Sequence, residues 1–104
     1  MEKNKNIKTA FLDTWTESEA GWGQRSDGCS IHLSKEDYKT YVKKYWDSMP
    51  DVAPDEYERP DGGLREVVLS NTLYKRLKKT KFGMRLWQSE LRELKEKKEI
   101  LFTD

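Results

Sequence analysis

The segment 34–49 constrains the fold more than any other part of the sequence, because its large apolar side chains follow a helical repeat. They recur at spacings of three, four, seven, eight and eleven residues, which places them on one stripe of an α-helix. The stripe consists of Tyr38, Tyr41, Val42, Tyr45, Trp46 and Met49. Ser34 and Asp37 approximate a capping box at the start, and Pro50 ends the helix. Such an aromatic stripe is typical of a core face, so we expect the helix to lie across a second layer.

Two segments that precede this helix alternate in polarity and predict strands of that layer. In segment 7–15, Phe11 and Trp15 share one face while Leu12 lies on the other. In segment 29–33 the apolar residues point inward, and we expect Ser30 and His32 to point outward to solvent. The simplest arrangement is an antiparallel pair joined by a loop over residues 16–28.

The rest of the chain predicts shorter elements. Segment 51–63 is rich in Pro, Gly and acids and indicates an ordered loop with polyproline II character. A strand over 64–69 leads into a short helix capped by Ser70 or Asn71, and a further strand is expected over 82–87. A charged helix follows over 88–98, and residues 100–102 continue it or form a short strand. The predicted fold class is therefore α+β, with a small, mostly antiparallel sheet of three to four strands and all three helices packed on one face.

Length and composition favour one folded domain over residues 1–104, with residues 1–6 frayed. Charged residues make up 38% of the chain and hydrophobic residues only 35%, but 12% are aromatic, which argues against disorder. Cys29 is the single cysteine, so no intrachain disulfide forms, and we expect a small apolar strand residue in a reducing compartment. The sequence shows neither a signal peptide nor a membrane span, which predicts a cytoplasmic protein.

Several classes of chemistry are missing from the sequence. One His and one Cys cannot form a His/Cys zinc site, and no phosphate-binding loop, dinucleotide fingerprint or hydrolase nucleophile motif occurs. Cys29 and His32 lie three residues apart on one predicted strand, so their side chains point to opposite faces. We therefore expect no enzyme, no cofactor and no metal.

The stretch GWGQRSDGCS at 21–30 is the strongest binding candidate. Trp22 offers a stacking surface between two glycines, Gln24 can read a base edge, and Arg25 supplies a planar fork for an anion. Asp27 begins the turn into the next strand. The alternative is structural, with Trp22 folded over the core and Arg25 paired with Asp27 or Glu19.

A second candidate is a basic run interleaved with two aromatic residues, a mixture typical of single-stranded nucleic-acid binding. It comprises Lys75, Arg76, Lys78, Lys79, Lys81 and Arg85, with Tyr74 directly before the run and Phe82 within it. Arg76, Lys79 and Arg85 are the candidate ligand residues, and the alternative is an ordinary solvated helix face. Tyr57 and Arg59 on the acidic loop could reach a ligand or a partner subunit, or pack on the main helix.

Charge is distributed unevenly along the chain. Residues 1–62 carry nine Lys/Arg against thirteen Asp/Glu, whereas residues 63–104 carry eleven against six. Such asymmetry indicates either an anionic partner for the basic part or two segments that face each other.

A short, charged, aromatic-rich chain without a catalytic motif resembles the small accessory proteins of bacteriophages and mobile elements, some of which resemble inhibitors of host defence. The first hypothesis, favoured by the loop chemistry of Trp22 and Arg25, is a non-enzymatic protein that sequesters an anionic nucleotide-like small molecule as a homo-oligomer, away from any membrane and in the host cytoplasm if the chain is phage-encoded. The second hypothesis is a protein–protein inhibitor whose acidic loop 47–61 blocks a nuclease or defence effector. The third is a single-stranded nucleic-acid-binding module.

Overall fold

The computed structural model describes residues 8–19, 23–49 and 57–103, without the side chains of Glu19 and Tyr57. The elements in chain order are β1 (Thr9–Glu19), β2 (Gly23–His32), α1 (Lys35–Ser48), β3 (Tyr57–Pro60), β4 (Arg65–Leu69), α2 (Asn71–Lys78), β5 (Met84–Leu86), α3 (Gln88–Glu96) and β6 (Ile100–Phe102). The fold is α+β, as predicted, and none of the helices in this part of the chain has the length and apolarity that crossing a bilayer requires.

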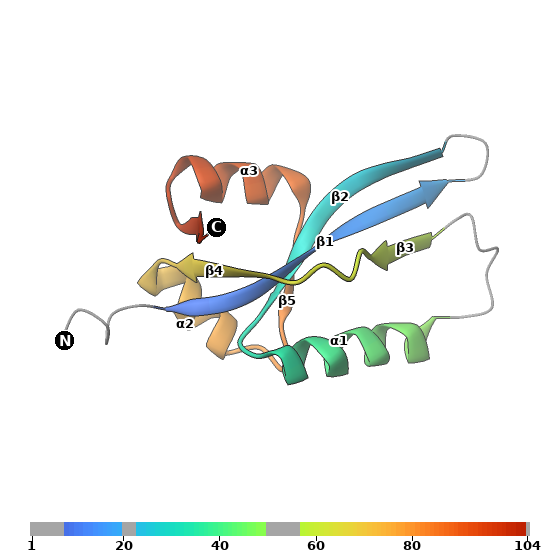
Figure 1. The fold of residues 1–104 in the computed structure, drawn as a ribbon, viewed down its shortest axis with the longest axis horizontal. Coiled ribbons are helices and arrows are strands. Elements are labelled where there is room, and N and C mark those ends of the chain that lie inside the picture. Colours follow the sequence, from blue (N-terminus) through green and yellow to red (C-terminus); the bar gives the residue numbers. More distant parts are fainter. Residues whose placement is uncertain (1–7, 20–22, 50–56, 104) are drawn as a thin grey trace.

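Strand β1 is the centre of the sheet (Figure 1). One edge of β1 pairs with β2, and the other edge pairs with β4 and then β3, all antiparallel. The order is β5-β2-β1-β4-β6, with β3 off this path. The described residues thus form six strands, and the prediction of three to four is wrong. Strand β3 has four residues, too short to show alternation in the sequence, and β6 is the short strand that the sequence allowed over residues 100–102 as one of two alternatives.

Strands β1 and β2 form a long antiparallel pair, and the predicted loop over residues 16–28 is wrong for 16–19 and 23–28, which are strand. Cross-strand pairs run from Phe11 opposite His32 to Glu19 opposite Gly23. A β-bulge interrupts the ladder near Trp15, where Gly28 has a φ of 82°. A side chain at Gly28 would meet the Leu86 carbonyl at 2.1 Å, so this position requires glycine.

One face of the sheet carries the apolar core. Leu12 of β1, Ile31 of β2 and Val67 of β4 are at most 1% exposed and pack with Leu73 of α2 and Leu91 of α3. The N-cap of α2 is Ser70, one of the two predicted caps, and its side chain accepts a hydrogen bond from the backbone N–H of Leu73. Helices α2 and α3 therefore cover this face.

Helix α1 covers the opposite face, so the prediction that all helices pack on one face is wrong. Its Tyr38 and Tyr45 contact Asp13 and Trp15, which alternate along β1 with the core residue Leu12. Figure 1 shows α1 and α3 on opposite sides of the sheet. Both faces of the central strands are buried, and the side chains under α1 are polar and aromatic. The α1 stripe itself stays half-buried, and Trp46 is 41% exposed.

Asp13 joins β1, α1 and the β3–β4 connection. Its carboxylate is fully buried and accepts hydrogen bonds from the Tyr38 hydroxyl and from the backbone N–H groups of Gly62 (2.9 Å) and Gly63 (3.2 Å). Burial and this hydrogen bond to Asp13 raise the pKa of Tyr38, which keeps its hydroxyl a donor. Asp13 thereby closes the irregular connection that separates β3 from β4 along the same edge of β1.

We expect Asp13→Ala to lower the free energy of unfolding by about 2–4 kcal/mol, because it leaves three donors without their acceptor. Urea unfolding at pH 7.5 measures the effect. The matched control is Asp47→Ala, which removes only an exposed i,i+4 pair with Lys43 and should change the stability far less. Equal losses in the two variants would contradict the structural role of Asp13.

Candidate functional site: a pocket between α1 and β5

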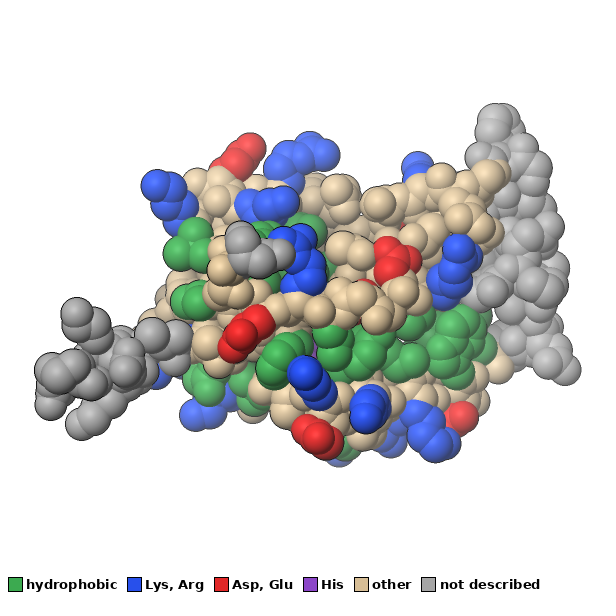
Figure 2. Space-filling view, viewed as in Figure 1, with side chains coloured by type: hydrophobic (Ala, Val, Ile, Leu, Met, Phe, Trp, Pro, Cys, Tyr) green, Lys and Arg blue, Asp and Glu red, His purple; other side chains and the backbone are tan. Residues whose placement is uncertain are grey.

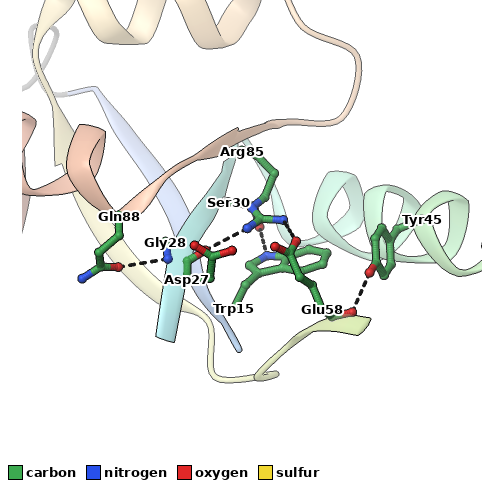
Figure 3. Close-up of polar contacts among 8 residues, drawn as sticks. All are labelled: Trp15, Asp27, Gly28, Ser30, Tyr45, Glu58, Arg85 and Gln88. Atoms are coloured by element: carbon green, nitrogen blue, oxygen red, sulfur yellow. Dashed lines mark hydrogen bonds and ion pairs between the residues drawn. The ribbon is translucent and has the colours of Figure 1, made fainter. Parts of the chain in front are cut away.

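A cation–aromatic stack lies at the junction of β1, β3 and β5 (Figure 3). The Arg85 guanidinium carbon lies 4.5 Å from the ring centroids of both Trp15 and Trp87. Arg85 Nη1 donates to Glu58 Oε1 at 2.7 Å, and Nη2 donates to the Asp27 carbonyl at 2.8 Å. The Glu58–Arg85 ion pair joins the acidic and basic segments of the chain to each other.

Three carboxylates meet beside this stack. Oxygen atoms of Glu17, Asp27 and Glu58 lie within 4.8 Å of one another, and hard cations prefer such donors. Two of the three already form ion pairs, Glu17 with Arg25 at 2.8 Å and Glu58 with Arg85. Burial, together with a hydrogen bond to Asp27, raises the pKa of Glu58 above its ordinary value, against the opposing effect of Arg85. A bound cation would have to displace two guanidinium groups, so the cluster fits a structural role better.

The residues predicted to bind a ligand are only partly brought together. Arg85 and Asp27 meet in the stack just described, and Arg25 forms an ion pair with Glu17 at 2.8 Å. Gln24 is exposed on β2. Trp22, the residue on which that prediction most depends, lies outside the described residues. These residues stay predicted ligand contacts.

The other predicted residues lie on separate elements. Arg59 is half-buried on β3 opposite Thr16, and Tyr57 begins that strand. The stretch predicted as a polyproline II loop thus includes β3. Arg76 and Lys79 are exposed at the C-terminal end of α2, on the other side of the sheet's centre from β3 (Figure 1). The fold therefore does not gather the described members of the predicted set into one site.

A chain of hydrogen bonds runs under α1 from Trp15 to the loop before β5. Trp15 Nε1–H donates to Ser30 Oγ at 2.9 Å, and Ser30 Oγ lies 2.7 Å from His32 Nε2. His32 Nδ1 lies 2.7 Å from the Phe82 carbonyl oxygen. His32 and Ser30 are fully buried, and the prediction that they face solvent is wrong, because α1 covers their side of the sheet.

The tautomer of His32 follows from its partners. A carbonyl oxygen only accepts, so Nδ1 carries the hydrogen that Phe82 receives. Nε2 is then the acceptor in the neutral ring, and Ser30 donates to it while accepting from Trp15. Burial lowers the pKa of His32 below 6.5, so the ring is neutral at pH 7. Each polar side-chain atom in this series of hydrogen bonds, from Trp15 to His32, therefore has a hydrogen-bond partner.

Phe82 and Gly83 have an unusual backbone where this chain ends. Phe82 has a φ of 73°, a left-handed conformation that is a true outlier for a bulky side chain. A Cβ on Gly83 would lie 2.2 Å from His32 Nδ1, so only glycine allows the loop to approach the ring. Strain of this kind costs about 1–3 kcal/mol and clusters at functional sites. The outlier therefore directs attention to the surface that Phe82 lines.

That surface is a pocket of about 370 Å³ between α1 and the loop before β5, here called the α1–β5 pocket. It is lined by Tyr41, Lys44, Tyr45, Ser48, Lys81, Phe82 and Gly83. The helical spacing of 41, 44, 45 and 48 places four of them on one face of α1. Figure 2 shows the band of hydrophobic side chains where α1 meets the sheet, with Lys and Arg side chains around it.

Several polar groups of the pocket are not used within the protein. Lys44 and Lys81 have no carboxylate partner, and the Tyr41 hydroxyl has no hydrogen-bond partner, among the residues that the structure describes. Lys44 Nζ lies 5.7 Å from the centroid of the Phe82 ring. The Tyr45 hydroxyl, by contrast, donates to the Glu58 carbonyl, and Ser48 Oγ donates to the Tyr45 carbonyl. Two ammonium groups, one hydroxyl and three aromatic rings are thus left facing one hollow.

The sequence analysis did not predict this pocket, although it singled out several of the residues that line it. Lys81 and Phe82 belong to the basic run, and Tyr41 and Tyr45 belong to the helical stripe. Lys44 lies outside that stripe. The signal that was available is the Phe82-Gly83 pair, an aromatic residue followed by glycine just before a strand. Its left-handed backbone is not visible in a sequence.

The comparisons with known proteins add no identity: no protein family, curated protein or solved structure matches this chain.

We expect the fold to lose stability as the pH falls below 6.5. His32 binds a proton less readily when folded than when unfolded, so protons favour the unfolded chain between the folded pKa and 6.5. The slope approaches about 1.4 kcal/mol per pH unit for one proton. Urea unfolding between pH 7.5 and 5.5 measures it.

His32→Asn is the control, because its amide can still donate to the Phe82 carbonyl but does not titrate. Glu58, whose raised pKa gives the opposite slope, is common to both proteins and cancels in the comparison. The same slope in both proteins would contradict the assignment of this dependence to His32.

Proposed function

We propose that this chain is a binding protein for a small anionic aromatic molecule, nucleotide-like in chemistry, which it holds in the α1–β5 pocket without transforming it. The observation that carries the proposal is the pair of lysines, Lys44 and Lys81, which enter one aromatic hollow with no carboxylate partner among the described residues. Ammonium groups without a partner favour an anion, and a phosphate is the common biological one.

The remaining lining supports an aromatic ring on the ligand. Tyr41, Tyr45 and Phe82 give flat apolar surface, on which a base can stack with little dependence on its identity. The hydroxyl of the half-buried Tyr41 can form a hydrogen bond with a polar edge of the ligand. Burial raises the pKa of Tyr41, so this hydroxyl stays protonated and can donate.

The size of the pocket restricts the ligand further. At about 370 Å³ it is near the lower end of the roughly 300–1,000 Å³ usual for small-molecule sites. This favours a ligand of about one nucleotide over a larger oligonucleotide.

A role without catalysis is supported by His32 and Cys29. The imidazole is fully buried with both nitrogens engaged, and burial raises the pKa of the Cys29 thiol to about 12.

A sequestering role in counter-defence would fit such a binder, given the resemblance of the chain to phage and mobile-element accessory proteins. A protein–protein inhibitor that uses the segment 47–61 has less support. Within that segment Glu58 is paired with Arg85, and Asp61 accepts hydrogen bonds from Thr14 and Thr16. Single-stranded nucleic-acid binding, homo-oligomerisation and a cytoplasmic location stay predictions.

Isothermal calorimetry with adenosine 5′-monophosphate, adenosine and inorganic phosphate tests the proposal at low salt. We expect the nucleotide to bind more tightly than either of its parts, and added salt to weaken it. Lys44→Gln and Lys81→Gln should each weaken nucleotide binding by about tenfold or more, because a charge-assisted hydrogen bond contributes about 1.5–3 kcal/mol.

Lys39→Gln is the matched control, since it removes a lysine from an exposed position of α1 outside the pocket. Its affinity should equal that of the unmodified chain. No binding of the nucleotide, or equal losses in all three variants, would show that the pocket is not the site.

A further inference from the structure

His32 lies directly behind the wall of the α1–β5 pocket. Gly83, which lines the pocket, approaches the ring so closely that a Cβ there would lie 2.2 Å from Nδ1. Phe82, also in the lining, accepts the Nδ1–H hydrogen bond. The Tyr41 ring, on the other side of the pocket, lies 5.0 Å from the imidazole centroid. Three lining residues thus touch the only histidine in the chain.

We propose that an anion enters the α1–β5 pocket together with a proton that is taken up by His32. This inference rests on the proposed function and deepens it, because it states how binding at the site responds to pH. It predicts a ligand that is held more tightly in mildly acidic solution than at neutral pH.

The free protein disfavours a charged His32 for a reason visible in its hydrogen bonds. Protonation puts a hydrogen on Nε2, which would then donate to Ser30 Oγ. Ser30 already accepts from Trp15, so its own hydrogen would lose its acceptor. Desolvation of the fully buried ring acts in the same direction.

The charged groups around His32 come from each element packed against it. Asp13 of β1 and Asp37 of α1 favour the imidazolium, and Asp13 is already shared among three donors. Tyr38 and Tyr41 of α1 present neutral rings at 5.1 and 5.0 Å. On β5, Arg85 pairs in register with Ser30, and its charge is balanced by Glu58.

On the pocket side of the wall lie Lys44 and Lys81, which have no carboxylate partner among the described residues. A bound phosphate neutralises them and adds negative charge across the thin wall formed by Gly83. An opposite charge within about 4–6 Å raises the pKa of a histidine by one unit or more. Coupling of this kind is reciprocal, so protonation of His32 must raise the affinity for the anion to the same extent.

The single histidine makes the test direct, because its Cε1–H gives one signal in a proton–carbon NMR spectrum. The signal is followed from pH 4.5 to 8.5 in the free protein, with saturating adenosine 5′-monophosphate, and with saturating adenosine. We expect the nucleotide to raise the pKa of His32 by about one unit. Adenosine, which has the ring without the charge, should leave it unchanged.

Affinity gives a second readout. The probe is adenosine 5′-monosulfate, whose ester keeps its charge throughout this range. Its affinity should rise as the pH falls from 7.5 to 5.5, by up to about tenfold, and the dependence should vanish in His32→Asn.

The outcomes separate this inference from the proposed function. If the nucleotide shifts the signals of Tyr41 and Phe82 but leaves the His32 pKa unchanged or lower, the pocket binds the ligand and the proton coupling is wrong. If neither the nucleotide nor the monosulfate shifts those signals, the proposed function itself fails, and the coupling with it. An equal rise in pKa with adenosine would also overturn the inference, because no charge would be involved.

Discussion

A fully buried histidine must find a partner for each of its ring nitrogens, and this requirement organises the α1 side of the molecule. His32 meets it with Ser30 on the same strand and with the carbonyl of Phe82, fifty residues away in sequence. The second partner pulls the loop before β5 against the sheet, and only Gly83 allows so close an approach. The left-handed backbone of Phe82 is held by the same contact, and the pocket wall is built on it.

The polar layer under α1 differs from the apolar core on the opposite face of the sheet. The core around Leu12, Ile31 and Val67 is stabilised by the hydrophobic effect, which is not directional. On the α1 side, side chains are instead held by hydrogen bonds with specific partners. Asp13 fixes the β3–β4 connection and the start of α1, and Arg85 fixes β3 against β5. Such a layer sets the positions of side chains more narrowly than apolar packing does. This is why the pocket lies at its edge.

Local patterns predicted much of this fold. The alternation in segment 29–33 correctly places Ile31 and His32 on opposite faces of the sheet. The N-caps Ser34 and Ser70 are both among the predicted caps. Alternation in one strand does not show whether its polar face is buried, because this depends on the face of the sheet against which α1 packs. His32 was therefore expected at the surface. The strands β3 and β6 are too short to carry a pattern, and each forms only because a longer strand offers it an edge.

The site was less accessible to sequence reasoning than the fold. Arg85 and Asp27 were singled out and do meet, but as parts of a structural stack with Trp15. The α1–β5 pocket combines a helix face with a loop forty residues later, and no spacing rule connects Lys44 with Lys81. The backbone of Phe82, which marks the site, depends on a tertiary hydrogen bond and is not encoded by the residue type.

The hydrogen-bonded state of His32 is open to direct measurement in the free protein. A long-range proton–nitrogen NMR correlation at pH 7.5 reports which nitrogen of the single imidazole carries the hydrogen. The structure predicts a protonated Nδ1 and an acceptor Nε2, because the Phe82 carbonyl can only accept. A ring protonated at Nε2 alone would mean that Phe82 receives no hydrogen bond from His32, and the described origin of the pocket wall would be wrong.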